Sequence, residues 1–246
     1  MDIGYKSHIG NLRAKNQDAY LVLEKSSAKV IILAVADGLG GHNAGEIASS
    51  TLVKEIKDKF DNTNIIDEER IQEQEVIEII KKINKIIYEM GSNDVNLSKM
   101  GTTLCLSIIA NQQVHIFHVG DSRAYIINEK EILQLTRDHS LVEQLISQGE
   151  ISREEAQTYP NKNVITRAIG TDEEIEVDYY QCELKSGDAI LLCTDGLTNE
   201  VEAEEIKDII NKHNCEEAVE VLVQKANEYG GHDNITVIVY KPEVVL

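Results

Sequence analysis

The chain has 246 residues with 43 acidic and 24 basic side chains, which gives a formal net charge of −19 at pH 7. A surface this acidic repels phosphate backbones and anionic lipids, so we expect neither nucleic acid nor a membrane as a partner. Hydrophobic residues make up 42 %, and the 15 Gly and 2 Pro argue against long linkers, which predicts a single packed domain over residues 1–246.

The N-terminal residues lack a basic region followed by an apolar stretch, and the longest apolar runs have the length of strands. We therefore expect no signal peptide and no membrane span. The four cysteines form no C-x-x-C pair, and Cys105 and Cys193 lie inside apolar runs, as core residues do. This use of cysteine suits a reducing cytoplasm, where we expect the protein to reside.

In the first half of the chain, strands give way to helices and then return. Apolar, β-rich runs predict strands at 20–23 and 29–36. Asn43, with Glu46 three residues later, is a candidate N-cap for a helix that reaches Phe60. The elements predicted after it are a long helix at 68–90 and strands at 102–110, 113–119 and 122–128.

The second half repeats this block pattern after a polar stretch. Residues 149–163 are polar and predict an exposed insertion, in which Ser152 and Glu155 form a capping-box pattern for a short helix. The other elements predicted here are a helix at 141–147, strands at 175–184 and 189–194, helices at 203–212 and 216–229, and a strand at 235–240. Strands and helices grouped in blocks favour an α+β fold with antiparallel sheets over a doubly wound parallel sheet.

Four of the apolar runs meet an aspartate at one end: Asp37, Asp121, Asp195 and Asp233. Each such residue places a charge at a fixed point on the rim of a sheet, and four of them suggest a shared site. Carboxylates cluster only where something offsets their repulsion, and the usual agent is a hard divalent cation. An oxygen-only site suits Mg²⁺ or Mn²⁺ and disfavours zinc. Two such ions activate a shared water, most commonly for the hydrolysis of a phosphate ester.

Other phosphatase and nucleotide chemistries lack their residues in this chain. A cysteine nucleophile needs Cys-x5-Arg, but the residues six positions after the cysteines are Asn111, Asp188, Asn199 and Val221. Neither a Gly-x4-Gly-Lys-Ser/Thr loop nor a His-Glu-x-x-His motif is present. Metal-activated water therefore remains, and Arg13 is the best candidate to hold a phosphate, since its planar fork matches two oxygens.

Taken together, these residues and the motifs around them resemble the PPM (PP2C-like) family of metal-dependent protein phosphatases, especially the compact bacterial serine/threonine phosphatases. The match spans nearly the whole chain in order, and the ordered set is highly specific. The matching motifs are Arg13-x-x-Asn16-Gln17-Asp18, Val35-Ala36-Asp37-Gly38-Leu39-Gly40-Gly41-His42, Gly101-Thr102-Thr103, Val119-Gly120-Asp121-Ser122-Arg123, Thr136-x-Asp138-His139-Ser140, Ile165-Thr166-Arg167-Ala168-Ile169-Gly170, Thr194-Asp195-Gly196-Leu197 and Gly231-His232-Asp233-Asn234-Ile235-Thr236.

The resemblance implies a four-layer α-β-β-α sandwich, in which antiparallel helix pairs flank two antiparallel sheets. It implies two Mn²⁺ or Mg²⁺ ions at one end of the sandwich. By this comparison Asp37 bridges the two ions, the carbonyl of Gly38 joins one of them, and Asp195 and Asp233 join the other.

The same resemblance assigns the surrounding residues. Asp18 matches a carboxylate that orients metal-bound water, and Arg13 matches the phosphate anchor. Bacterial relatives often hold a third, weaker ion, whose ligands match Asp121 and Asp195. The insertion at about 141–165 matches a flap that borders the cleft and influences substrate choice, and Asn234 matches a residue beside the metals.

One position departs from the animal-type members, which carry a histidine directly after the Asp-Gly pair. Here that residue is Leu39, as is common among bacterial members. The general acid is then either His42, three residues later, or a metal-bound water, and the sequence leaves both open.

The leading hypothesis is a protein serine/threonine phosphatase that acts on phosphoserine and phosphothreonine and opposes a Ser/Thr kinase of the same bacterium. The alternative is a catalytically silent relative that binds phosphoproteins, but such a relative is expected to lose a metal-binding Asp. We expect a monomer. The sequence leaves open the choice between Mn²⁺ and Mg²⁺, the physiological substrates, and activity on phosphotyrosine or phosphoarginine.

Overall fold

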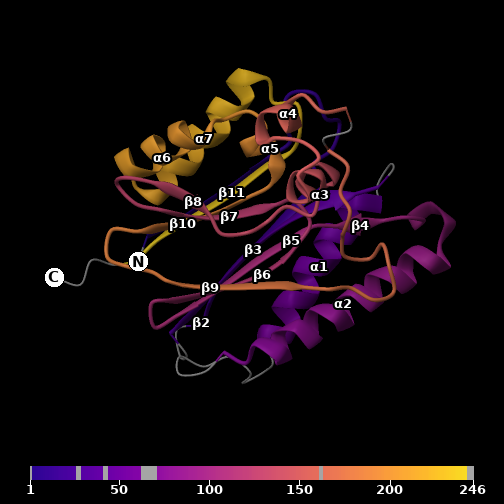
Figure 1. The fold of residues 1–246 in the computed structure, drawn as a ribbon. Helices are drawn as coiled ribbons and strands as arrows, with labels where there is room; N and C mark the ends of the chain where they lie inside the picture. Colours follow the sequence, from indigo (N-terminus) through magenta and orange to yellow (C-terminus); the bar gives the residue numbers. More distant parts are fainter. Residues whose placement is uncertain (1, 26–28, 41–43, 62–70, 161–162, 243–246) are drawn as a thin grey trace.

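Two antiparallel sheets stacked face to face form the centre of the molecule, and helices cover the outer face of each sheet (Figure 1). The computed structural model describes residues 2–25, 29–40, 44–61, 71–160 and 163–242. The four-layer α-β-β-α sandwich of the α+β class, which the sequence predicts, is therefore the observed fold.

The first sheet has five strands in the order β1-β11-β10-β7-β8. Their bounds are β1 Asp2–His8, β11 Ile235–Lys241, β10 Ala189–Cys193, β7 Arg123–Ile127 and β8 Ile132–Gln134. The helices on its outer face are α6 (Ala203–Lys212) and α7 (Cys215–Tyr229). A single turn of helix, α5 (Asp195–Thr198), directly follows β10.

The second sheet follows the order β2-β3-β5-β6-β9, and a short sixth strand, β4, pairs with the end of β3. The bounds are β2 Asp18–Lys25, β3 Val30–Leu39, β4 Gly101–Thr102, β5 Leu104–Ala110, β6 Gln113–Val119 and β9 Asp178–Glu183. The long helices α1 (Ala44–Asp61) and α2 (Glu73–Asn93) cover this sheet, and a 3₁₀ turn, η1 (Val95–Leu97), follows them.

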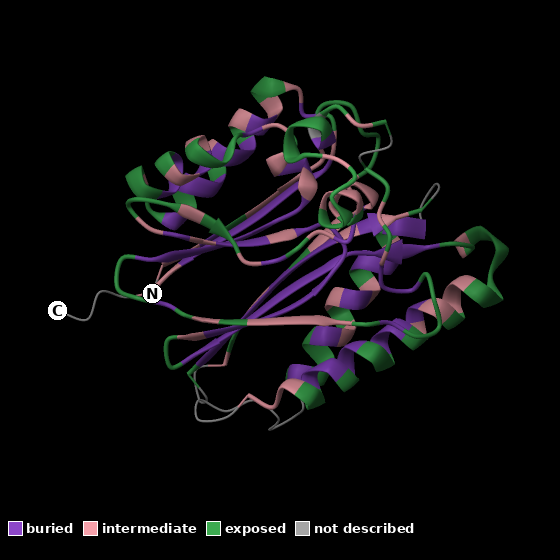
Figure 2. Ribbon diagram, viewed as in Figure 1, coloured by how far each residue is buried: buried purple, intermediate pink, exposed green. Residues whose placement is uncertain are grey.

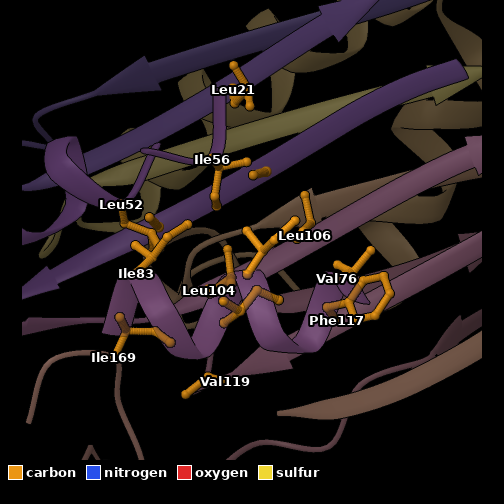
Figure 3. Close-up of a cluster of buried hydrophobic side chains, with 14 of the residues drawn as sticks. Leu21, Leu52, Ile56, Val76, Ile83, Leu104, Leu106, Phe117, Val119 and Ile169 are labelled. Carbon is orange, nitrogen blue, oxygen red and sulfur yellow. The ribbon is translucent and has the colours of Figure 1, made fainter. Parts of the chain in front are cut away.

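The central strands are buried on both faces, which explains their continuous apolar sequences (Figure 2). Along β3, Ile32 and Ala34 face the helices, and their neighbours Leu33 and Val35 face the opposite sheet. Figure 3 shows the helix-side cluster, where side chains of α1 and α2 meet those of the sheet. Each fully buried Leu or Ile contributes about 1.5–3 kcal/mol to folding.

Three further sequence predictions agree with the structure. The helix at 203–212 has the predicted bounds, and the helix predicted from 216 begins at Cys215, where the Asn214 side chain caps it. Cys105 and Cys193 are fully buried, as core residues. The predicted N-cap Asn43 lies outside the described residues, as do the first residues of the helix predicted at 68–90.

Two edge strands, β1 and β8, were not predicted from the sequence. β1 pairs with β11 at one edge of the first sheet, and only Gly4 within it is buried, so it carries no apolar run. β8, at the other edge, has three residues. Edge strands contact the core on fewer sides, and they are therefore weakly patterned.

The polar insertion forms two short helices, α3 (Leu141–Gln148) and α4 (Arg153–Gln157). The capping box predicted for Ser152 and Glu155 is present, with both of its hydrogen bonds. A bridge between Ser140 and Ile165 closes the segment at its base. Among the residues described, no helix combines the length and apolar character needed to cross a bilayer.

Candidate functional site

The fold brings five aspartates from distant parts of the sequence into one region. Asp18 opens β2 and lies opposite Asp37 in the register of β2 and β3. Asp195 begins α5 after β10, Asp233 precedes β11, and Asp121 follows β6. Burial raises the pKa of Asp37 well above its usual range, and the charges of the other four aspartates raise it further. The four strand-end aspartates noted in the sequence are thus neighbours, and Asp18 joins them.

The carboxyls of this cluster resist full ionisation. Burial raises the pKa of Asp18 to about 7, against two hydrogen bonds that lower it. Burial and the charge of Asp195 raise the pKa of Asp121 to about 8. The pKa of Asp195 is also raised, by burial and by the charge of Asp233. Buried like charges of this kind call for a cation between them.

Three carboxylate oxygens in the cluster have no hydrogen-bond donor in the part of the chain that the structure describes. Oδ1 atoms of Asp18, Asp121 and Asp195 are buried and accept no hydrogen bond from the described residues. Buried oxygens of this kind are normally paired, and a hard cation pairs several at once. The donor set, all oxygen, fits Mg²⁺ or Mn²⁺. As they stand in the described ranges, no three or more His, Cys, Asp or Glu side chains are arranged to hold a metal ion.

Asp18 is held in place by two threonines of the first sheet. Its Oδ2 accepts hydrogen bonds from Thr194 Oγ1 at 2.9 Å and from Thr236 Oγ1 at 2.7 Å. The Thr236 amide donates to Thr194 Oγ1, which fixes the direction of the hydroxyl. Because Oδ2 is fully engaged, Oδ1 is the atom of Asp18 that remains for a ligand or a water.

The backbone of Asp37 is bracketed by Thr103, which lies between β4 and β5. The Asp37 amide donates to Thr103 Oγ1 at 2.8 Å, and the Thr103 amide donates to the Asp37 carbonyl at 2.9 Å. Thr103 Oγ1 also lies 2.6 Å from Ser122 Oγ. The turn that carries Asp121 and the strand end that carries Asp37 therefore share one hydrogen-bond network.

Gly38 lies where two other chain segments press against β3. A Cβ added at Gly38 would lie 2.2 Å from the Gly45 carbonyl oxygen and 2.6 Å from the Gln17 carbonyl oxygen. No side chain fits at such distances, so only glycine lets the first turn of α1 pack onto this strand. This packing fixes the Gly38 backbone beside Asp37.

Arg13 reaches the cluster from the loop before β2. Its Nη2 donates to Asp233 Oδ2 at 2.7 Å, and its side chain remains about half exposed. Asn234 holds this loop in place: its Nδ2 donates to the carbonyls of Ile9 and Lys15, and its Oδ1 accepts from the Gln17 amide. The guanidinium is thus presented to solvent at the edge of the carboxylates.

A cavity of about 640 Å³ adjoins the carboxylates on the side of α3 and α4. Asp121 and Asp195 line one part of it, and Ser140, Val142 and Ile146 line another. The insertion predicted to border the cleft therefore does lie beside these two aspartates. His42, the candidate general acid, is outside the described residues.

Sequence reasoning did not assign the residues that support the carboxylates. These are Thr194 and Thr236 at Asp18, Thr103 at Asp37, and Asn199, whose Nδ2 donates to Asp195 Oδ2 at 2.9 Å. A signal was present, because three of the four lie inside the motifs that carry the family resemblance.

Comparison with known proteins supports the family resemblance found in the sequence. The family described as Protein phosphatase 2C matches residues 6–236. The serine/threonine phosphatase stp of Listeria welshimeri is 40% identical over 239 residues, which are 97% of this chain and 94% of that protein. The crystal structure of serine/threonine phosphatase Stp1 from Staphylococcus aureus gives a TM-score of 0.93 at 36% identity, over 99% of this chain and 96% of that one.

A further structure, the catalytic domain of the serine threonine protein phosphatase PstP in complex with two manganese ions, gives a TM-score of 0.83 at 31% identity. The match covers 96% of both chains. The family match and these relatives place the chain in the class of metal-dependent phosphoprotein phosphatases, which are phosphoric monoester hydrolases. This chain belongs to the protein phosphatase 2C (PPM) family, and to its bacterial type.

Proposed function

We propose that this chain removes phosphate from phosphoserine and phosphothreonine in proteins, with two Mn²⁺ or Mg²⁺ ions bound at the carboxylate cluster. The observation that carries the proposal is the set of buried Oδ1 atoms on Asp18, Asp121 and Asp195, which accept no hydrogen bond from any described residue. They lie where five carboxylates meet, and divalent cations allow all five to be ionised at neutral pH, where several of them would otherwise hold a proton. The relatives named above are serine/threonine phosphatases, which supports the substrate class.

The ligands we propose for the two ions are Asp37, which bridges them, the carbonyl of Gly38, Asp195 and Asp233. Asp121 and Asp195 are our candidates for a third, weaker ion. When bound, such ions lower the pKa of a shared water and neutralise charge on the phosphoryl oxygens. The two manganese ions in the PstP relative support the count of two.

Arg13 is proposed to anchor the substrate phosphate. Its hydrogen bond to Asp233 uses Nη2 and holds the guanidinium beside the cluster. Nε and Nη1 make no hydrogen bond to the described residues, so the fork has donors left for two phosphate oxygens. The anchor and the metal ligand are thereby held at a fixed separation.

Asp18 is proposed to orient the attacking water. Its Oδ2 is fixed by two threonine hydroxyls, so Oδ1 is held in one position and accepts a hydrogen bond from the water. A carboxylate that accepts this bond points the lone pair of the water at phosphorus and raises its nucleophilicity.

The proton donor to the leaving group stays open between His42 and a water. Leu39, at the position of the animal-type histidine, has no proton to give. Residues 141–165 are proposed to act as a flap that shapes substrate choice, since α3 lines the cavity beside Asp121 and Asp195.

The catalytically silent alternative is disfavoured because every carboxylate that a metal centre would require is present. We further propose that the enzyme acts as a cytoplasmic monomer over one domain and opposes a Ser/Thr kinase of the same bacterium. The net charge of −19 supports the absence of nucleic-acid partners.

The test is hydrolysis of p-nitrophenyl phosphate and of a phosphothreonine peptide, each in EDTA, in Mg²⁺ and in Mn²⁺. We expect activity only with a divalent ion. Asp37→Asn should abolish it, and Asp208→Asn, an exposed substitution of the same type on α6, should leave it unchanged. Folded wild-type protein that is inactive with both metals would refute the proposal and favour the silent relative.

A further inference from the structure

A histidine at the base of the flap, His139, contacts the turn that carries Asp121. It follows Asp138 in the motif at 136–140, and only 8% of its surface is exposed. The Gly120 amide donates to His139 Nδ1 at 2.9 Å, and the His139 amide donates to the Gly120 carbonyl at 2.7 Å. The two residues are thus joined by a reciprocal pair of hydrogen bonds, one of which depends on the ring.

The hydrogen bonds of the ring define its tautomer. Nδ1 accepts from an amide, so the ring proton lies on Nε2, which is 3.2 Å from Asp178 Oδ2. Arg167 Nη1 lies 3.1 Å from Nε2, but its two N–H groups donate to Asp178 Oδ1 at 2.6 Å and to the Glu176 carbonyl at 3.5 Å. Burial and the charge of Arg167 lower the pKa of His139, which keeps the ring neutral. Asp178 on β9 therefore orients the imidazole towards Gly120.

The turn at Gly120 packs closely against Thr103 as well as against His139. Gly120 has a φ of +109°, in the region that favours glycine, and a Cβ there would lie 2.6 Å from Thr103 Cβ. Thr103 is the residue that brackets Asp37 and contacts Ser122. A turn wedged between His139 and Thr103 holds the next residue, Asp121, in one orientation.

His139 also holds the flap. Its carbonyl accepts from the Thr166 amide at 2.8 Å, and the Leu141 amide donates to the Val164 carbonyl at 2.9 Å. His139 and Leu141 therefore pair with the far end of the flap segment, and His139 also contacts the turn that carries a proposed metal ligand.

We propose that His139 is a positioning residue whose Nδ1, by accepting the Gly120 amide, aims Asp121 and so sets the affinity of the Asp121 site for a divalent cation. The inference rests on the proposed role of Asp121 as a metal ligand. Residues that orient metal ligands typically change metal affinity by about 10- to 100-fold when they are substituted. The Asp121 Oδ1 atom, buried and without a partner among the described residues, is the atom that gains from this orientation.

Two substitutions separate the two nitrogens of the ring. In His139→Asn the amide oxygen takes the place of Nδ1 and still accepts the Gly120 amide, but the contact with Asp178 is lost. In His139→Gln the amide group takes the place of Nε2 and keeps Asp178, but the Gly120 amide is left unpaired. His115→Gln is the matched control, because His115 is equally buried on β6 and contacts Tyr179 away from the carboxylates.

The experiment measures Mn²⁺ binding to the full chain by titration calorimetry and by the electron paramagnetic resonance signal of free Mn²⁺. Asp121→Asn is the reference variant. We expect His139→Gln to lower the affinity for the most weakly bound Mn²⁺ ion by about 10- to 100-fold, and we expect the same loss in Asp121→Asn. The double variant, His139→Gln with Asp121→Asn, should lose no more Mn²⁺ affinity than either single variant, because both substitutions disrupt the same interaction. His139→Asn should keep wild-type affinity, and so should His115→Gln.

Urea unfolding of each variant in EDTA distinguishes positioning from a general structural role. Equal losses of Mn²⁺ affinity in His139→Asn and His139→Gln would overturn the proposal, as would wild-type binding in His139→Gln or the absence of a weak third ion in the wild-type chain. If the wild-type chain binds Mn²⁺ but hydrolyses no phosphopeptide, the proposed function fails, whereas the Mn²⁺ titrations still support or overturn the role of His139.

Discussion

Replacing Asp18 by Asn should stabilise the metal-free protein while it impairs the enzyme. Asp18 is half-buried, its carboxyl lies among four others, and desolvation raises its pKa from 3.8 to about 7. Between these two values the folded state holds a proton that the unfolded state has released, so stability falls as pH rises through this window. The loss is complete above about pH 7, where both states are ionised.

The magnitude follows from the shift of about three pKa units. At 1.36 kcal/mol per unit the ionised Asp18 would destabilise the metal-free fold by about 4 kcal/mol if it were fully shielded from water. Asp18 is only half-buried, and solvent screening lowers this figure to about 2 kcal/mol. Asn is nearly the same size, and its Oδ1 still accepts from Thr194 and Thr236. At about pH 8 the variant should therefore exceed the wild type in unfolding free energy by about 2–4 kcal/mol.

The assay is urea unfolding in EDTA at several pH values between about pH 5 and pH 8. Wild-type stability should fall across this range, and the advantage of Asp18→Asn should shrink towards the acid end. Asp121, whose pKa is raised to about 8, adds to the same trend and remains in the variant. Exposed Asp208→Asn is the control and should follow the wild type. A wild-type stability that rises with pH, or an Asp18→Asn variant less stable at pH 8, would refute the reasoning.

Three further predictions concern the site. Arg13→Ala should lower kcat/KM for an aryl phosphate by about 10- to 100-fold in Mn²⁺, because a charge-assisted hydrogen bond to phosphate is lost. Arg13→Lys should recover part of this loss. Steady-state kinetics test both variants, and an unchanged kcat/KM would exclude Arg13 as the phosphate anchor. Asp37→Asn should reduce hydrolysis by about a thousandfold or more and raise the Mn²⁺ concentration needed for half-activation, measured by titration. Gly38→Ala should cost more than about 3 kcal/mol of stability in thermal unfolding, because its Cβ meets the Gly45 carbonyl at 2.2 Å; a normal melting temperature would contradict that packing.

The sequence predicted the central strands and the long helices because their patterns are strong. β3, β5 and β6 are buried on both faces, so continuous apolar runs mark them without ambiguity. The edge strands β1 and β8 were missed because half-exposed residues carry little pattern. The end of β3 was predicted at residue 36, three residues early, because β3 continues through Gly38 to Leu39 by pairing with β4.

The sequence predicted the candidate site as a set of acidic residues, and the tertiary structure showed how these residues are arranged. Periodicity marked Asp37, Asp121, Asp195 and Asp233 as ends of strands, but it gave no distances between them. Asp18 became a candidate only through the family resemblance, and the resemblance supported Arg13, which had been chosen for its guanidinium fork. Their roles, and those of the metal ligands, remain predictions that the experiments above address.

The sequence by itself determined the fold class, the family and the chemistry of the donor set, because residue types, their order and their local periodicity are properties of the chain. Only the tertiary structure decided which oxygens are satisfied and which are not. Thr194 and Thr236 hold one oxygen of Asp18, and His139 contacts the Asp121 turn across 19 residues of sequence. Such contacts join segments that are distant along the chain, and their partners are chosen by packing, which no local pattern records.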